Sequence, residues 1–147
     1  MISGFPGIGK STLVKSLPYA SDSDSSKHPK EGFPANYIDH IRTLIGKWRP
    51  IMISSHQEVR DALAEAGLPC TIVVPALHLK DAYMERYKGR GSPEPFLNLM
   101  NAQWDNFVNS CLNDTRFNKV VINDPNVNLA DVYTELNQTL PEFFYGK

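Results

Sequence analysis

The sequence predicts an α/β fold, with a mostly parallel five-stranded sheet and helices on both of its faces. Short apolar runs alternate with helix-like segments along the chain, and such alternation requires crossover connections between parallel strands. Residues 70–74 form a continuous apolar, β-branched run that is typical of a strand covered on both faces. A glycine-rich turn near the N-terminus joins a short apolar stretch to a helix-like segment, which gives the strand–turn–helix start of such a fold.

In the first half of the chain, glycine and proline delimit the expected elements. Pro18 stops the first helix, Gly46 and Gly67 close the next two, and Pro50 suits the first position of a strand. The expected elements are a strand at 1–3, a helix at 10–17, a strand at 19–20, a helix at 35–45, a strand at 51–53 and a helix at 57–66.

The second half continues the alternation. Ser92 is the expected cap of a long helix with Pro93 at its first position, and Asn128 is the expected cap of the last helix. The expected elements are a strand at 70–74, a helix at 78–88, a helix from 92 to about 111, a strand at 119–122 and a helix from 128 to about 138.

Length and composition bound the class of protein. The 147 residues predict a single domain, 1–147. The formal net charge of −1, with acids and bases mixed, argues against a protein whose main task is to grip nucleic acid through its backbone. Cys70 and Cys111 lie in apolar segments, which favours buried free thiols. The sequence contains no apolar run of membrane-spanning length and no charged-then-apolar leader, so we expect no membrane partner and a cytoplasmic location.

Residues 4–12 fit Gly-x-x-x-x-Gly-Lys-[Ser/Thr], the phosphate-binding P-loop. Its glycines let the main chain curl tightly, so that several N–H groups can face a polyphosphate. Lys10 is expected to reach the β- and γ-phosphates, and the Ser11 hydroxyl to ligate the bridging metal. We therefore expect ATP and Mg²⁺ as cofactors, with ATP bound by Gly4, Phe5, Pro6, Gly7, Ile8, Gly9, Lys10, Ser11 and Thr12.

A P-loop alone does not name the reaction, and the remaining motifs favour a kinase. A GTPase would carry Asn-Lys-x-Asp, whereas Asn118-Lys119 is followed by Val120 and Val121. A motor ATPase usually has an acidic residue at the end of the neighbouring strand, whereas here that strand ends in residues 54–56, Ser-Ser-His.

Asp22 and Asp24 follow the expected second strand and are candidates for the acceptor side. A hydroxyl or phosphate acceptor needs a nearby carboxylate that accepts its proton or orients it through Mg²⁺. We prefer Asp22 as the catalytic and metal-binding residue, because it lies nearer the strand end. For either residue taken alone, a solvated Ser/Asp loop is an equally good interpretation.

Arg86 and Arg90 indicate a short lid at about 86–93. Arginines between glycines, directly after a helix, can cap the charge that develops during phosphoryl transfer and shut out water. The alternative is a basic helix C-terminus favoured by the helix dipole. That alternative accounts for Lys88 but not for Gly89 and Gly91.

Four further residues are candidates for binding nucleotide or acceptor. Pro125 lies in a loop after the last strand, where a base could rest, although a simple turn with an N-cap explains the loop nearly as well. Tyr37 could stack on a base and Arg42 could pair with a phosphate. The alternatives place Tyr37 in the core and Arg42 in solvent. His56, at a strand's carboxyl end, could touch the acceptor or simply begin a helix.

Taken together, these segments resemble the nucleotide-kinase branch of P-loop proteins over nearly the whole chain. The sequence looks especially similar to small phage-encoded kinases whose P-loop reads Gly-Phe-Pro-Gly-x-Gly-Lys-Ser, with matching segments at 22–26, 33–38 and 90–94. It is more faintly similar to the kinase domain of polynucleotide kinases and to phage enzymes that phosphorylate hydroxymethyluracil in DNA. The resemblance implies a three-layer, P-loop kinase-like sandwich. The acceptor-binding region is shorter than in nucleoside monophosphate kinases, which leaves the acceptor open.

We therefore expect an enzyme, an ATP–Mg²⁺-dependent phosphotransferase whose acceptor is a nucleoside, a nucleotide or a related small molecule. Its expected catalytic residues are Lys10, Asp22, Arg86 and Arg90. One alternative is a kinase acting on a polynucleotide end or a modified base in DNA, for which a local basic groove around Lys80 and the lid could suffice. Another is a nucleotide-binding module without chemistry that serves a regulatory partner.

Overall fold

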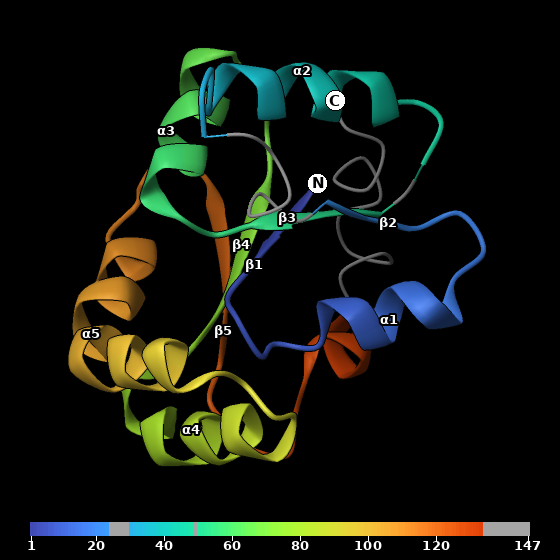
Figure 1. The fold of residues 1–147 in the computed structure, drawn as a ribbon. Helices are drawn as coiled ribbons and strands as arrows, with labels where there is room; N and C mark the ends of the chain where they lie inside the picture. The colour runs from blue at the N-terminus through green and yellow to red at the C-terminus, as the bar shows by residue number, and fades with distance from the viewer. Residues whose placement is uncertain (24–29, 49, 134–147) are drawn as a thin grey trace.

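The computed structural model describes residues 1–23, 30–48 and 50–133. These residues form an α/β structure around a five-stranded sheet with the strand order β2-β3-β1-β4-β5 (Figure 1). Each of the four strand pairs is parallel, so the predicted fold class is confirmed. The strands are β1 (Ile2–Gly4), β2 (Ser21–Ser23), β3 (Ile51–Ser54), β4 (Thr71–Pro75) and β5 (Asn118–Ile122).

Helices lie on both faces of this sheet, with α2 and α3 on one face and α1 on the other (Figure 1). Residues 129–133 are also helical. None of the helices in the described ranges is both long and apolar enough to cross a membrane. The helices are α1 (Lys10–Ser16), α2 (Ala35–Leu44), α3 (Gln57–Glu65), α4 (Lys80–Gly89) and α5 (Glu94–Leu112), with a 3-10 turn, η2 (Leu77–Leu79), before α4.

The side chains of β3 divide the core between the two faces. Ile51 and Ile53 join an apolar cluster with residues of α2 and α3. Met52 belongs to a larger cluster that includes Leu13 of α1 and Trp104 of α5. Successive residues of a strand face opposite sides of a sheet, so β3 is covered on both faces, as a central parallel strand requires. Both cysteines are buried free thiols, as expected.

The prediction for the second strand was wrong. It placed the strand at residues 19–20, whereas β2 occupies Ser21–Ser23. Tyr19 is 68% exposed, and pairing with β3 begins only where the Ser21 N–H donates to the Pro50 carbonyl at 3.0 Å. A three-residue edge strand is placed by its partner's hydrogen bonds, and the apolar character of its own residues carries little information.

The start of the long helix also differs from the expectation. Helix α5 begins at Glu94 with extended Pro93 at the N-cap position, and a proline lies in its first turn at Pro95. The Ser92 hydroxyl accepts a hydrogen bond from Arg90 Nε at 3.1 Å instead of capping the helix. Both prolines suit a helix start, and the structure uses the second one in the first turn. The single helix expected at 78–88 is divided between η2 and α4.

Candidate phosphate-binding site

The loop that joins β1 to α1 has the backbone of a tight glycine turn. Gly7 and Gly9 have φ values of +84° and +105°, a region that is costly for other residues. Gly4 needs to be small for a different reason. A Cβ atom at Gly4 would lie 2.7 Å from Cδ of Lys10. The motif glycines therefore let the loop curl and let the lysine side chain pack closely over the end of β1.

Neighbouring elements hold the carbonyl groups of this loop. Tyr87 Oη donates to the Pro6 carbonyl at 2.7 Å, and Arg86 Nη1 donates to the Gly7 carbonyl at 3.0 Å. The Leu129 N–H donates to the Ile8 carbonyl at 2.8 Å. In a trans peptide, the C=O and the following N–H point in opposite directions. The donors from α4 and from residue 129 therefore direct N–H groups of the loop away from themselves.

Of the three N–H groups that follow these carbonyls, the one of Ile8 donates to the Phe5 carbonyl at 3.1 Å. Within the described residues, no protein group accepts a hydrogen bond from the N–H of Gly7 or Gly9. Helix α1 begins directly after the loop, with no side-chain cap and no acidic residue in its first turn. N–H groups of a glycine-rich turn that leads into a helix are donors of the type that binds anions.

Lys10 lies at the same place. Its side chain is half-buried, and its ammonium group folds back and donates to the Gly4 carbonyl. This contact keeps the positive charge beside the loop. An ammonium on a flexible stem can exchange a carbonyl for a more strongly charged acceptor.

Ser11 and Asp22 meet beside the loop. Ser11 Oγ donates to Asp22 Oδ2 at 2.9 Å, and both residues are exposed. Asp22 lies within β2, and not after the second strand as the sequence analysis placed it. Asp24 lies outside the described residues. A hydroxyl and a carboxylate are ligand types that suit Mg²⁺, which commonly takes one or two carboxylates and fills its remaining positions with water and phosphate oxygens. The donor set therefore fits this metal.

Of the two expected lid arginines, Arg86 contacts the P-loop directly, whereas Arg90 stacks on Tyr87, which in turn contacts the loop. Besides the Gly7 carbonyl, Arg86 donates to the Pro125 carbonyl, and its guanidinium lies 4.3 Å from the ring centroid of Tyr83. Arg86 thus links the P-loop to the loop after β5. Exposed Arg90 stacks on the ring of Tyr87 at 5.0 Å. In this geometry Arg86 lies against the loop and Arg90 against Tyr87, and their role as a lid stays a prediction.

The loop after β5 is the turn with an N-cap that the sequence left open as an alternative. The Asn126 N–H donates to Asp124 Oδ1 at 2.8 Å. Asn128 caps the following helix, since its Oδ1 accepts from the Ala130 N–H at 3.0 Å. The same segment touches the P-loop, because the Leu129 N–H is the donor to Ile8. Pro125 is exposed at this turn, close to the phosphate loop through Arg86.

Three expected acceptor contacts fare differently in the structure. Tyr37 is fully buried and donates to the Ser23 carbonyl, so the expectation that its ring stacks on a base is corrected and Tyr37 is a core residue. Arg42 is exposed near the C-terminal end of α2. It lies five positions beyond Tyr37, about 7.5 Å along the helix. That distance takes Arg42 away from the carboxyl end of β2, where Tyr37 bonds to Ser23. His56 is exposed at the N-cap position of α3, directly after β3. It remains at the edge where the P-loop lies.

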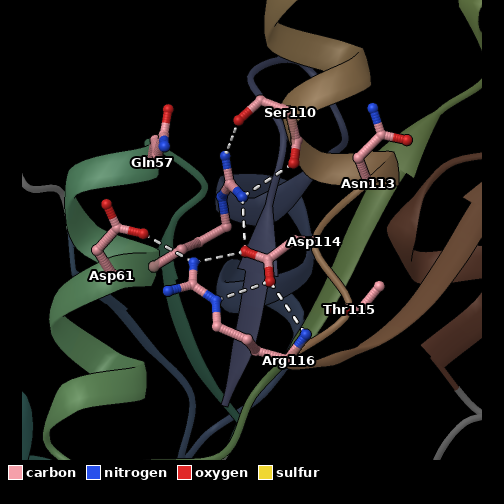
Figure 2. Close-up of a pocket in the computed structure, with 8 residues that line it drawn as sticks. Gln57, Asp61, Ser110, Asn113, Asp114, Thr115 and Arg116 are labelled. Carbon is pink, nitrogen blue, oxygen red and sulfur yellow. Dashed lines mark hydrogen bonds and ion pairs between the residues drawn. The ribbon is translucent and has the colours of Figure 1, made fainter.

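A second polar cluster, which the sequence analysis missed, lines a surface pocket of about 410 Å³ between α3 and the segment after α5 (Figure 2). Its centre is a buried ion pair, with Arg60 Nη1 at 2.7 Å from Asp114 Oδ2. Hydrogen bonds from Arg116 and Arg60 hold the pKa of Asp114 well below its usual range, although burial acts in the opposite direction. Arg60 Nε also donates to the Ser55 carbonyl at 2.9 Å. The cluster therefore fixes the turn that carries His56.

These polar residues were missed because their partners are far apart in the chain. The Arg60–Asp114 pair spans 54 positions, and no local pattern marks a contact of that range. Tyr87 was missed as a site residue as well. It lies inside the lid segment, one helical turn after Tyr83, but an aromatic residue at helical spacing is more typical of a core.

Comparisons with known proteins add no assignment at this point. No protein-family model matches the chain, and no curated protein matches it at a significant level. The functional interpretation therefore depends on the loop, the residues that surround it and the motifs of the sequence.

Proposed function

We propose that this protein is an ATP–Mg²⁺-dependent phosphotransferase that acts on a nucleoside, a nucleotide or a related hydroxyl or phosphate acceptor. One observation carries the proposal. A P-loop motif forms a loop whose carbonyls are held from outside, while Lys10 and the Ser11–Asp22 pair lie at the same place. A P-loop next to a hydroxyl and a carboxylate is an arrangement that supports phosphoryl transfer in P-loop proteins.

The residues of this chain have distinct roles in the proposed reaction. N–H groups of the loop bind the β-phosphate, and Lys10 leaves the Gly4 carbonyl to bind the β- and γ-phosphates. Arg86 adds a second positive charge from the α4 side of the loop. Asp22 orients the acceptor, either by accepting the proton of a hydroxyl or through the metal. Arg90, which is exposed at the end of α4, is the residue available to cover the site.

Ser11 and Asp22 are the residues that would hold Mg²⁺, because their hydroxyl and carboxylate oxygens meet beside the loop. A Mg²⁺ ion held by these two residues would neutralise negative charge that develops on the transferring phosphate. A site with one hydroxyl and one carboxylate is sparse for a metal held by protein alone. It suits a metal that arrives with a nucleotide.

The decisive experiment measures ADP release with ATP, Mg²⁺ and a panel of acceptors. The panel contains nucleosides, nucleoside monophosphates and a DNA oligonucleotide with a free 5′-hydroxyl. We expect the wild-type protein to release ADP with one acceptor class and the Lys10→Ala variant to lose at least about 100-fold in rate. Lys15→Ala is the matched control, because Lys15 is exposed in the last turn of the same helix.

Each outcome of this panel assigns a function. The same panel is run with ATP labelled in its γ-phosphate, and label that enters a small nucleoside or nucleotide supports the proposal. Label that enters only the oligonucleotide assigns a kinase of polynucleotide ends. ATP binding without any product would make the protein a nucleotide-binding module. Undiminished turnover by Lys10→Ala would refute the assignment of the P-loop.

A further inference from the structure

Tyr87 lies directly behind the phosphate loop. Its ring is fully buried, and its hydroxyl donates to the Pro6 carbonyl at 2.7 Å. The ring also fills the space beside Gly7, since a Cβ atom at Gly7 would lie 2.8 Å from Cε1 of Tyr87. One side chain therefore determines both the direction of the Pro6 carbonyl and how closely the loop can approach α4.

The position of Tyr87 is itself fixed by packing. Its ring makes an edge contact with Phe96 of α5, with centroids 5.1 Å apart and an interplanar angle of 83°. The guanidinium of Arg90 lies over the ring at 5.0 Å. Burial raises the pKa of Tyr87 above its ordinary value, so the hydroxyl stays protonated and continues to donate at neutral pH.

We propose that Tyr87 is a positioning residue for phosphate binding, an inference that rests on the proposed function of the loop. The hydroxyl holds the oxygen of the Pro6–Gly7 peptide toward α4. The N–H of the same trans peptide, on Gly7, then points in the opposite direction. That N–H has no acceptor within the described residues. Tyr87 thus keeps a donor directed toward the phosphates, and without its hydroxyl the peptide loses the hydrogen bond that holds its oxygen.

Tyr83 provides a matched control on the same helix. It is also fully buried, it also lies against the loop, and a Cβ atom at Gly7 would be 3.3 Å from its Cδ2. Its hydroxyl, however, makes no hydrogen bond to a carbonyl of the loop within the described residues, and the charged group beside it is Arg86. Tyr83→Phe and Tyr87→Phe both keep the ring in the core. Only Tyr87→Phe removes a hydrogen bond to the loop, the one to the Pro6 carbonyl.

The test measures the affinity of both variants and the wild-type protein for ATP–Mg²⁺ and for inorganic tripolyphosphate by calorimetry. We expect Tyr87→Phe to bind both ligands about tenfold more weakly, the loss of roughly one hydrogen bond. Tyr83→Phe should stay within about twofold of the wild type. In ¹⁵N spectra recorded without ligand, the Gly7 and Ile8 amide resonances should shift in Tyr87→Phe and remain in place in Tyr83→Phe.

A purely structural role predicts a lower melting temperature with unchanged affinity at 25 °C, and that result would overturn the inference. If the wild type itself binds neither ligand, the proposed function fails and this inference fails with it. If the wild type binds and Tyr87→Phe binds equally well, only the role of Tyr87 is refuted. Phe96→Leu, which removes the ring contact that fixes Tyr87, is the second variant. It should weaken tripolyphosphate binding less than Tyr87→Phe does.

Discussion

Substituting Asp114 by Asn perturbs the buried ion pair at the centre of the second polar cluster (Figure 2). The side chains of Arg60 and Asp114 are each 3% exposed, and their closest atoms are 2.7 Å apart. Asparagine keeps nearly the same shape but removes the negative charge. The variant therefore leaves the guanidinium of Arg60 buried with neutral acceptors, namely the carbonyl oxygens of Ser55 and Ser110.

The structure sets the size of the expected loss in stability. Removing one partner of a buried pair typically costs about 3–5 kcal/mol. We expect the lower end, about 3 kcal/mol, because Arg60 keeps several hydrogen bonds. Arg60→Met should cost less, since Asp114 still accepts from Arg116 Nη2 at 2.9 Å. The Arg116 side chain is 41% exposed, so solvent screens its attraction to Asp114. Arg116→Ala should therefore lower the free energy of unfolding by about 1 kcal/mol or less.

Urea unfolding followed by circular dichroism tests both the order and the pH dependence of these losses. The pKa of Asp114 is lowered in the folded state, so the stabilisation is complete above the unfolded pKa of about 4. It is lost progressively as the pH falls from there toward the lower pKa of the folded state. The difference in free energy of unfolding between wild type and Asp114→Asn should therefore be largest near pH 7. It should decrease as the pH is lowered from about 5 to 3. A difference that is under 1 kcal/mol at pH 7, or that stays constant down to pH 3, would refute this reasoning.

Two further predictions concern the site itself. Asp22→Asn should lower the rate of phosphoryl transfer at least about 100-fold and raise the Mg²⁺ concentration needed for half-maximal activity. The control is Asp39→Asn, on the exposed side of α2, which should change neither quantity. Equal dependence of activity on Mg²⁺ in the two variants would contradict the metal assignment. Gly7→Ala should abolish ATP binding and destabilise more than Gly32→Ala does, by urea unfolding. Both positions have positive φ and share that cost, but only Gly7 has the ring of Tyr87 within 4 Å. Equal losses at the two glycines would show that the ring contact is unimportant.

The order of the helices and strands could be predicted from the sequence because it follows from local signals. Apolar periodicity placed α2, α3 and the central strands β3 and β4 to within a residue or two. The P-loop motif located the β1–α1 turn, because its glycines are required by the local backbone itself. The sequence signals were weaker where pairing with another strand determines the position of an element. Strand β2 is such a case, since its three residues contain no apolar side chain and it is placed by pairing with β3.

The sequence predicted which motif residues lie at the candidate site, but not the residues with which they form hydrogen bonds. Ser11 and Asp22, both expected at the metal site, form a hydrogen bond with each other, and their binding of a metal stays a prediction. The hydrogen-bond partners of Arg86 did not follow from the sequence, because a pattern of arginines and glycines does not distinguish an arm over the phosphates from a contact to the Gly7 and Pro125 carbonyls. Contacts of Tyr87 and Arg60 connect distant segments and depend on tertiary packing alone.

The register of β2 explains why Asp22, among the polar residues near it, faces the P-loop. Asp22 pairs with Met52 across the parallel ladder, and residues paired in register point to the same face of a sheet. Met52 packs in the cluster that includes Leu13 of α1, so the carboxylate lies on the side of α1 and meets Ser11. Ser23 pairs with Ile53, which packs with residues of α2. A slip of one residue would turn Asp22 toward α2. The apolar partners in β3 therefore specify the proposed metal pair as firmly as the motif does.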